Sequence, residues 1–287
     1  MKCEICPRRC CIDRCKNRGY CGQSNKVKIS KVMLHHYEEP LISGNENDNG
    51  SGAIFFAGCN LKCVYCQNYP ISHKYKGKNI SIRKLVKLYK KLEKQGAYNI
   101  NLVTPTHYTE QIIESLQIYK PKIPIVWNSS GYETKETIKR LKEYIDIYLV
   151  DLKYMDNQIA NKYSKAPNYV EFASDAIKQM KQNQPNDIIK NGLMKKGIIV
   201  RHLVLPTHTT NSLKCLDFVA NNLGINSIVS IMSQYEPRYD AVKYPEINRK
   251  ITPLEYKRVI NHAIKLNLDN CFVQDLSSAN SKYTPKF

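Results

Sequence analysis

Short apolar runs alternate with stretches of helical periodicity along most of the chain, and this alternation restricts the folds open to it. From Gly52 onward, each apolar run is followed by a segment whose apolar residues recur every three or four positions. The expected strands are 52–58, 100–104, 123–127, 146–152, 197–205 and 227–232. Strands alternating with helices predict a parallel sheet with βαβ crossovers. These units are fewer than the eight of a closed barrel. We therefore expect an α/β fold built as an open, partial barrel, with a doubly wound sheet as the alternative.

Capping signals mark two of the expected helices. Ser81 can cap a helix whose apolar face ends near Gly96. Thr252 and Glu255 form a capping box with a proline at the first helical position. Other helical faces are expected around 112–116, 138–141, 172–180 and 213–223. The segment 26–50 is expected to contain a strand and loops, with a polar turn at 45–52.

Three cysteines lie in the loop directly after the first expected strand. Cys59, Cys63 and Cys66 are spaced C-x3-C-x2-C within GCNLKCVYCQN, residues 58–68. In parallel α/β folds, functional sites form at the carboxyl ends of the strands, where this loop lies. Structural zinc takes four protein ligands. Three thiolates on an iron–sulfur cubane leave one iron open to a substrate or cofactor, which favours chemistry at the metal.

The compartment and the charge bear on which partners to expect. The start, MKCEICPRRC, lacks the apolar stretch of a secretory signal, so we expect a cytoplasmic protein whose 11 cysteines stay reduced. No apolar run approaches the length of a membrane span. The net charge of +19 comes from lysines spread along the chain. This favours a solvated surface over a nucleic-acid site, although a zinc-stabilised, basic nucleic-acid-binding protein is the alternative to an enzyme.

The cysteine spacing, with Tyr65 before the third cysteine, resembles the signature of radical S-adenosylmethionine (SAM) enzymes. The wider pattern is similar to pyruvate formate-lyase activating-enzyme-like proteins over nearly the whole chain. It consists of CPRRC, EEPLISG, GSGAIFFAGCNLKCVYCQN, NLVTPTH, DLKYMD and RHLVLP. The resemblance implies a partial (β/α)6 barrel and a [4Fe–4S] cluster that cleaves SAM to a 5′-deoxyadenosyl radical. It also implies a flavodoxin or ferredoxin-like electron donor. The radical would abstract a hydrogen atom, either from a glycine of a partner protein or from a peptide or small molecule.

The resemblance also implies roles for particular residues. Cys59, Cys63 and Cys66 match the cluster ligands, the alternative being a zinc loop with a fourth cysteine from elsewhere. Asp151 and Lys153 match a D-x-K motif whose lysine lies near the SAM carboxylate, the alternative being a strand-end ion pair. Asn128, Ser129 and Ser130 are also implied to contact SAM, the alternative being that they form a polar turn. His202 is implied to face SAM as well, the alternative being a histidine buried in the core.

One expected motif is missing. Many members of this superfamily carry GGE at the end of the second strand, where it meets the SAM amino group. Here the strand ends in Thr104-Pro-Thr-His107. The amino group is then expected to be held by Thr104, Thr106 or His107.

The first 50 residues are expected to form a cysteine-rich, metal-binding extension to a radical SAM core at 51–287. Four thiols on a short, poorly patterned segment predict a closed site for zinc or an auxiliary iron–sulfur cluster. They are Cys3, Cys6, Cys10 and Cys21, with Cys11 or Cys15 as possible substitutes and an unligated tail as the alternative. Two polar clusters are further candidates for the substrate side. His35, His36, Glu38 and Glu39 before the first expected strand could orient substrate or bind a cation, the alternative being a solvated loop. Tyr235, Glu236 and Arg238 follow the last expected strand.

Overall fold

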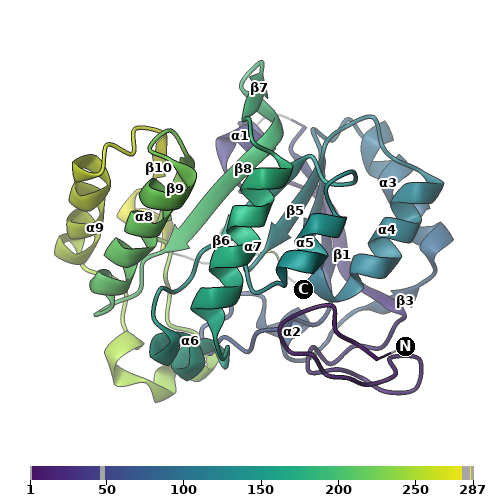
Figure 1. Cartoon of the computed structure of the whole chain (residues 1–287), viewed down its shortest axis with the longest axis horizontal. Coiled ribbons are helices and arrows are strands. Elements are labelled where there is room, and N and C mark those ends of the chain that lie inside the picture. The colour runs from purple at the N-terminus through teal and green to yellow at the C-terminus, as the bar shows by residue number, and fades with distance from the viewer. Residues whose placement is uncertain (1, 46–48, 280–284, 286–287) are drawn as a thin grey trace.

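The computed structural model describes residues 2–45, 49–279 and 285, and within them it contains a ten-stranded sheet (Figure 1). In sheet order the strands are β10 (Cys271–Val273), β9 (Ile228–Met232), β8 (Leu193–Leu203), β6 (Ile147–Asp151), β5 (Ile125–Ser129), β4 (Ile100–Val103), β2 (Ser51–Phe56), β1 (Val27–His35) and β3 (Lys78–Ile80). A further strand, β7 (Ile188–Lys190), forms a hairpin with β8.

The strands from β10 through β2 pair in parallel, whereas β1 and β3 are antiparallel additions at one edge. The sheet order ends at β10 on one side and β3 on the other, so the sheet is not closed into a barrel. The predicted α/β class with an open, mostly parallel sheet is thereby confirmed.

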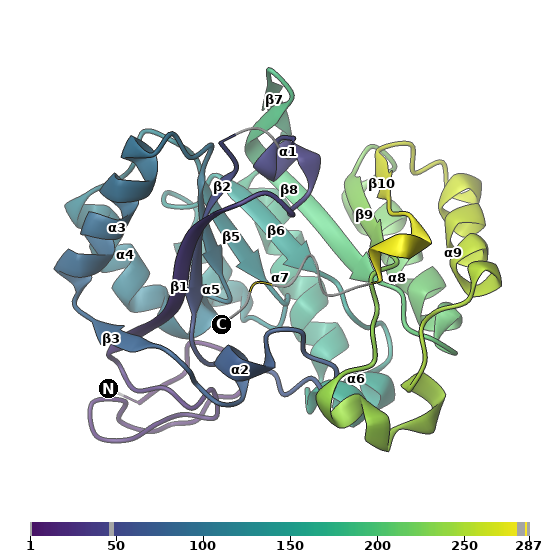
Figure 2. The same ribbon diagram turned by 180° about the vertical axis from the view of Figure 1, so that it is seen from behind.

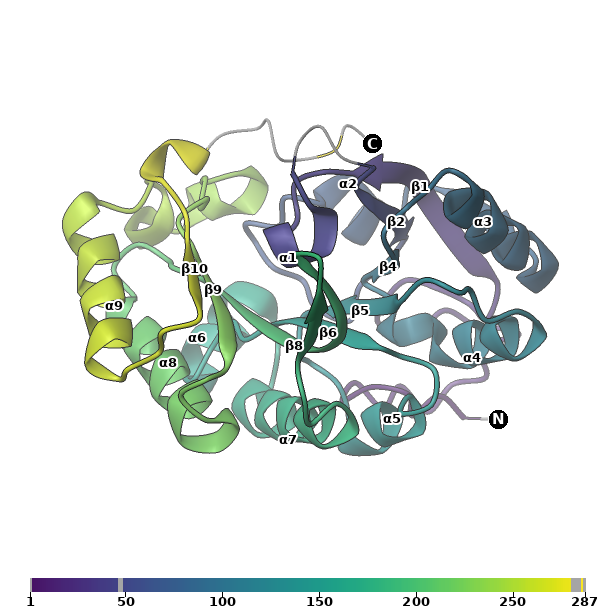
Figure 3. The same ribbon diagram turned by 90° about the horizontal axis from the view of Figure 1, so that it is seen from above.

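Most of the α-helices in the described residues cover the convex side of the curved sheet (Figure 3). They are α3 (Ile82–Lys94), α4 (Thr109–Ile118), α5 (Lys135–Arg140), α7 (Tyr169–Asn183), α8 (Thr209–Leu223) and α9 (Pro253–Lys265). The other α-helices in the described residues are α1 (Pro40–Ser43), α2 (Tyr69–Ser72) and α6 (Asn157–Ser164), with 3-10 turns η1 (Thr106–Tyr108), η2 (Tyr239–Lys243), η3 (Pro245–Ile247) and η4 (Leu276–Ser278). Both predicted caps are present: Ser81 accepts from the amide of Lys84, and Thr252 and Glu255 form the capping box of α9.

Successive side chains of each strand point to opposite faces of the sheet, so the core has an outer and an inner part. In β2, Ile54 and Phe56 belong to the large outer cluster under the helices, whereas Ala53 and Phe55 belong to an inner cluster. On the concave side, Ile42 of α1 packs against apolar side chains of β5, β6, β8 and β9. Further along the same strands, every second side chain also points to the concave side, beyond this apolar cluster.

Some elements differ from the expectations. The strand expected to begin at 197 begins at Leu193, because its first residues pair with β7 in a hairpin that carries little apolar pattern. Neither α6 nor β10 was expected. The polar turn expected at 45–52 falls partly on 46–48, outside the described residues. No helix in the described ranges has both the length and the apolarity to cross a membrane.

The cysteine-rich segment 2–26 contains an isolated bridge between Lys2 and Asp13 and is otherwise irregular. It lies at the same edge of the molecule as α2 and α6 (Figures 1 and 2). Gly58, which ends the turn out of β2, packs directly against this segment. Its φ is +89°, and a Cβ built on it would lie 2.6 Å from the carbonyl oxygen of Cys21 and 2.5 Å from Cγ of Gln23.

We predict that Gly58→Ala destabilises the protein more than Gly224→Ala does. Both glycines have positive φ, but a Cβ at Gly224 meets nothing within 4 Å. The backbone strain alone costs about 1–2 kcal/mol, and overpacking at Gly58 adds roughly 1–3 kcal/mol. Chemical denaturation of both variants measures the difference. Equal losses of stability would contradict a tight contact between the cysteine loop and the N-terminal segment.

Candidate active site

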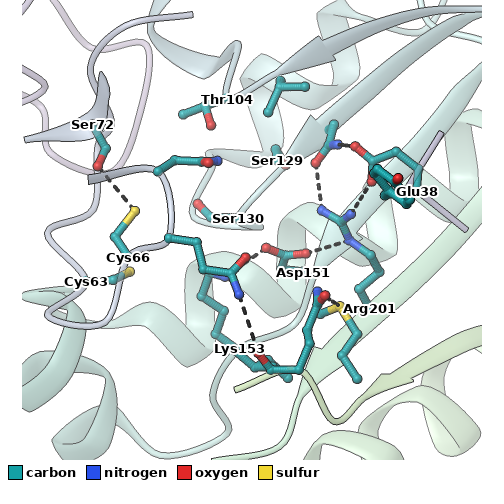
Figure 4. Close-up of a pocket in the computed structure, with 18 of the residues that line it drawn as sticks. Glu38, Cys63, Cys66, Ser72, Thr104, Ser129, Ser130, Asp151, Lys153 and Arg201 are labelled. Atoms are coloured by element: carbon teal, nitrogen blue, oxygen red, sulfur yellow. Dashed lines mark hydrogen bonds and ion pairs between the residues drawn. The ribbon is translucent and has the colours of Figure 1, made fainter. Parts of the chain in front are cut away.

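A cavity of about 420 Å³ opens at the carboxyl ends of the parallel strands (Figure 4). Its volume is within the range of small-molecule sites. The loop after β2 contributes Cys59, Cys63 and Cys66 to its lining. Other polar residues that line it include Glu38, Glu39, Thr104, Asn128, Ser129, Ser130, Asp151, Lys153, Arg201, Gln234 and Glu236. The fold therefore brings these residues from seven separate segments to one place.

Each thiol of the central trio has a hydrogen-bond partner. The Cys59 sulfur accepts from the amide of Leu61 at 3.4 Å. The Cys63 sulfur accepts from the Ser164 hydroxyl at 2.9 Å, and Cys66 lies 3.2 Å from the Ser72 hydroxyl. Donors aimed at sulfur favour the charged thiolate, which is the form that ligates metals.

The cysteine loop is held in place by the end of α6. The amide of Lys62 donates to the carbonyl of Ser164 at 3.0 Å, and that of Val64 donates to the carbonyl of Tyr163 at 2.8 Å. Asn60 donates its side-chain amide to the carbonyl of Tyr132 at 2.6 Å. A helix missed by the sequence analysis thus positions the most specific motif in the chain.

The trio suits a cationic cluster better than it suits free thiols. Burial, followed by the charge of neighbouring thiols, raises the pKa of Cys59 to about 12. Burial likewise raises the pKa of Cys63 to about 11, although Lys153 opposes it. Buried thiols of this kind ionise when a metal supplies the compensating charge.

No group of three or more histidine, cysteine, aspartate or glutamate side chains in the described residues is arranged to hold a single metal ion. A cubane is larger than an ion and takes one thiolate at each of three corners, so its ligands stand apart. Three thiols that line one cavity supply one thiolate for each of three corners, which fits a [4Fe–4S] cluster with one open iron.

Beside the thiols, Arg201 is the centre of a buried polar network. It donates from Nε to Asp151 at 2.8 Å, from Nη1 to Glu38 at 2.7 Å and from Nη2 to Asn128 at 2.7 Å. Asn128 also donates to Glu38 at 3.0 Å. Burial alone would lower the pKa of Arg201, but the surrounding carboxylates raise it above its usual value. The guanidinium therefore stays charged and fixes the strand ends relative to one another.

Asp151 joins this network to Lys153. Its second oxygen accepts from Nζ of Lys153 at 2.8 Å. Burial would raise the pKa of Asp151, but Arg201 and Lys153 outweigh burial and lower it. Burial would lower the pKa of Lys153, but Asp151 and then Cys63 raise it. The site thus holds a fixed ammonium group close to the thiols.

The wall opposite the thiols is acidic. Burial raises the pKa of both Glu38 and Glu39 despite the opposing charge of Arg201. Oε2 of Glu39 has no hydrogen-bond partner and lies 3.8 Å from Nη1 of Arg201. The sequence analysis gave His35, His36, Glu38 and Glu39 as candidate substrate contacts. His35, Glu38 and Glu39 line the cavity, whereas His36 does not. Tyr235 and Glu236 also line it, and Arg238 pairs with Glu236.

Three residues expected near SAM point elsewhere. His202 lies in the strand next to Arg201 and therefore faces the opposite side, where it bonds the carbonyl of Leu152 and the hydroxyl of Ser212. Thr106 donates to Glu133 at 2.8 Å, and His107 bonds the carbonyl of Ala57 at 2.8 Å. Among the described lining residues, Thr104, Asn128, Ser129 and Ser130 are the expected neutral contacts that reach the cavity.

Two important residues were not identified from the sequence. Arg201 lies within the apolar run 197–205, and a charge inside a buried strand was the available signal. Glu133 is fully buried and accepts from Thr106, Trp127 and Ser129, each at 2.8 Å. It ties the ends of β4 and β5 together behind the cavity. The four N-terminal cysteines lie outside the cavity lining, in segment 2–26.

Comparison with known proteins identifies a family. Residues 53–216 match the radical SAM superfamily. The chain is 36% identical over 280 residues to the uncharacterized protein MJ0674 of Methanocaldococcus jannaschii, covering 93% of this chain and 75% of that protein. It is 24% identical to MJ0808 of the same organism, covering 89% of this chain and 75% of that one.

Solved structures show the same fold at low sequence identity. SuiB of Streptococcus suis bound to S-adenosylmethionine superposes with a TM-score of 0.54 at 13% identity, covering 76% of this chain and 48% of that one. The hydrogenase maturase HydG of Carboxydothermus hydrogenoformans gives a TM-score of 0.51 at 16% identity, covering 75% and 50%. The match therefore spans about half the length of each of these two solved proteins.

We predict that Arg201→Met destabilises the protein by about 3–5 kcal/mol, because it leaves Glu38 and Asp151 without their shared cation in a buried site. The matched control is Arg140→Met, which removes the exposed pair with Glu110 and is expected to cost less than about 1 kcal/mol. Denaturant unfolding of the two variants provides the comparison. A loss at Arg201 as small as the loss at Arg140 would contradict the network's role in holding the site together.

Proposed function

The chain belongs to the radical SAM superfamily, and from this premise we propose that it cleaves SAM reductively and abstracts a hydrogen atom from a second substrate. The observation that carries the proposal is the convergence of Cys59, Cys63 and Cys66 on one cavity beside a buried ammonium group. This combination provides both a seat for a three-thiolate cluster and a cation for an anionic ligand group.

In this proposal the three cysteines hold a [4Fe–4S] cluster. When bound, the cluster supplies the electron that splits the SAM sulfonium into methionine and a 5′-deoxyadenosyl radical, the species that takes the hydrogen atom. The protein's own part is to position SAM and exclude water. The buried hydroxyls of Ser164 and Ser72 hold two of the thiols in place.

Lys153 is proposed to bind the SAM carboxylate. It lines the cavity, its side chain is 16% exposed, and it acts electrostatically on Cys63. Asp151 fixes the ammonium through a 2.8 Å bond and is itself held by Arg201. Thr104, Asn128, Ser129 and Ser130 provide neutral hydrogen-bonding groups around the remainder of the ligand. In this proposal Thr106, His107 and His202 do not contact SAM. They support the residues that line the cavity from behind.

For the second substrate we propose a glycine of a partner protein, as in the pyruvate formate-lyase activating enzymes. The support is the D-L-K sequence at residues 151–153, which is similar to the D-x-K of glycyl-radical activases. A flavodoxin or ferredoxin-like protein is the proposed electron donor, and the cytoplasm is the proposed location. We also propose the division into an extension at 1–50 and a core at 51–287.

The competing function, a zinc-stabilised protein that binds nucleic acid through its net charge of +19, makes a different prediction. It requires colourless protein with a steeply salt-dependent affinity for nucleic acid. A cluster-bearing enzyme is brown and oxygen-sensitive. The cavity beside the thiols has no role in the competing function.

We predict that anaerobically reconstituted protein, reduced with dithionite and given SAM, produces 5′-deoxyadenosine. Cys63→Ala should reduce the product to the protein-free background, because one cluster ligand is lost. Cys215→Ala is the matched control: this thiol is also buried, but it lies on α8 and does not line the cavity. Chromatography of the nucleoside gives the readout. An inactive wild type that contains a reduced four-iron cluster would exclude SAM cleavage.

We further predict that Lys153→Met weakens SAM binding about tenfold, equivalent to roughly 1.4 kcal/mol, through the loss of one charge-assisted hydrogen bond. Equilibrium dialysis of labelled SAM measures the affinity, and iron content checks that the cluster is intact. Lys243→Met removes an exposed lysine paired with Asp240 and should leave the affinity unchanged. If Lys153→Met also binds SAM normally, Lys153 serves only as the ion-pair partner of Asp151.

A further inference from the structure

Segment 2–26 is ordered without an apolar core of its own. Its buried apolar side chains are those of Cys6 and Cys21. The other buried side chains in it, Arg14 and Gln23, are polar. A loop of this length cannot bury enough hydrocarbon to hold its shape, and short segments of this kind usually rely on a cross-link or a metal.

The thiols of the segment lie close together. Cys6 and Cys21 are buried, and Cys3 and Cys10 are partly buried in the same short segment. The sulfurs of Cys10 and Cys21 lie 3.4 Å and 3.6 Å from the same point, the position of a Cβ built on Gly19. The remaining two cysteines, Cys11 and Cys15, are exposed. The six thiols therefore form two groups: four that are buried or partly buried, and two that are exposed to solvent.

Backbone amides are aimed at the sulfurs of the inner group. Cys6 accepts from the amide of Arg8, and Cys21 accepts from the amide of Gln23. In both cases the donor is two residues after the cysteine. The central trio uses the same turn, with Cys59 accepting from Leu61 and Cys66 from Asn68.

Cys10 completes the set of backbone contacts, since it accepts from the amide of Tyr20 at 3.3 Å. A neutral thiol is a weak acceptor. Several N–H donors directed at sulfur suit thiolates, and hydrogen bonds of this kind are found around metal-bound cysteines. Arg14 adds a buried positive charge that acts on Cys21.

We propose that Cys3, Cys6, Cys10 and Cys21 together hold a second metal centre, either a zinc ion or an iron–sulfur cluster, through four thiolates. No three such side chains in the described residues surround one point at ion-binding distance, so ligation requires these side chains to turn inward. Each thiol that binds the metal releases one proton to solvent. The proposal does not depend on SAM cleavage.

The position of this centre gives it a mechanical consequence. Arg8, between Cys6 and Cys10, donates to the carbonyl of Asn60 at 2.8 Å and also to that of Lys165. The backbone of Cys21 packs on Gly58. A metal that fixes the segment therefore also fixes the loop that begins at Cys59.

The test begins by removing the catalytic cluster. The triple variant Cys59→Ala, Cys63→Ala, Cys66→Ala of the full chain is purified anaerobically, and its zinc, iron and acid-labile sulfide are measured per chain. The expected result is either about one zinc or about four irons with matching sulfide, retained without the central trio. The two patterns distinguish the two metals. If the triple variant contains no metal, the proposal is overturned, whether or not the wild type cleaves SAM.

Ligand assignment uses matched serine substitutions in the triple variant. Cys6→Ser and Cys10→Ser should lose the metal, whereas Cys11→Ser and Cys15→Ser should retain it. Loss of metal in the exposed pair but not in the inner group would refute the assignment.

A measurement on wild-type protein covers the case in which the inner variants do not fold. Alkylation mapped by mass spectrometry should modify Cys11 and Cys15 at once. Cys3 and Cys10, which are only partly buried, should react at least about tenfold faster after a chelator is added. Fast alkylation of Cys3 and Cys10 without chelator, or a disulfide between inner cysteines, would contradict a metal centre.

Discussion

The position of the cationic group in the cavity depends on one buried arginine. Arg201 binds Asp151, Glu38 and Asn128, which come from three different segments of the chain. Taking a guanidinium out of water costs several kcal/mol, and only good geometry with several partners recovers it. Because Asp151 uses one oxygen for Arg201, its other oxygen is directed to Lys153. The orientation of Lys153 toward the thiols therefore originates in a contact on the far side of Asp151.

The elements best predicted from the sequence are those in which local pattern and tertiary environment agree. The parallel strands were recognised because both their faces are buried, which makes each one a near-continuous apolar run. Ser81 and the Thr252–Glu255 box were recognised because caps are satisfied within a few residues. The cysteine trio lies in one short loop, so its spacing was readable before any fold was known.

What the sequence could not provide was mostly long-range. Arg201 and Glu38 are separated by 163 positions, and no local pattern connects them. Strand parity explains the placement of His202: Arg201 pairs in register with Asp151 and faces the cavity, so the next residue faces the helices. The short α6 has 8 residues, too few turns for a helical period to repeat clearly, yet its end carries Tyr163 and Ser164, which hold the cysteine loop. Glu133 could not be recognised because its three donors meet only after β4 and β5 have paired.

The contacts of segment 2–26 also determine when, during synthesis, this segment can dock onto the rest of the protein. It is translated long before its docking partners: the carbonyl that accepts from Arg14 is 93 positions on, and the hydroxyl that donates to the Ile5 carbonyl is 132 positions on. Contacts of such sequence separation form late. Until the chain has been translated past Lys165, the six thiols of the newborn segment are therefore exposed to cellular oxidants and competing metals. The reducing state of the compartment then matters for maturation of the chain as well as for its chemistry.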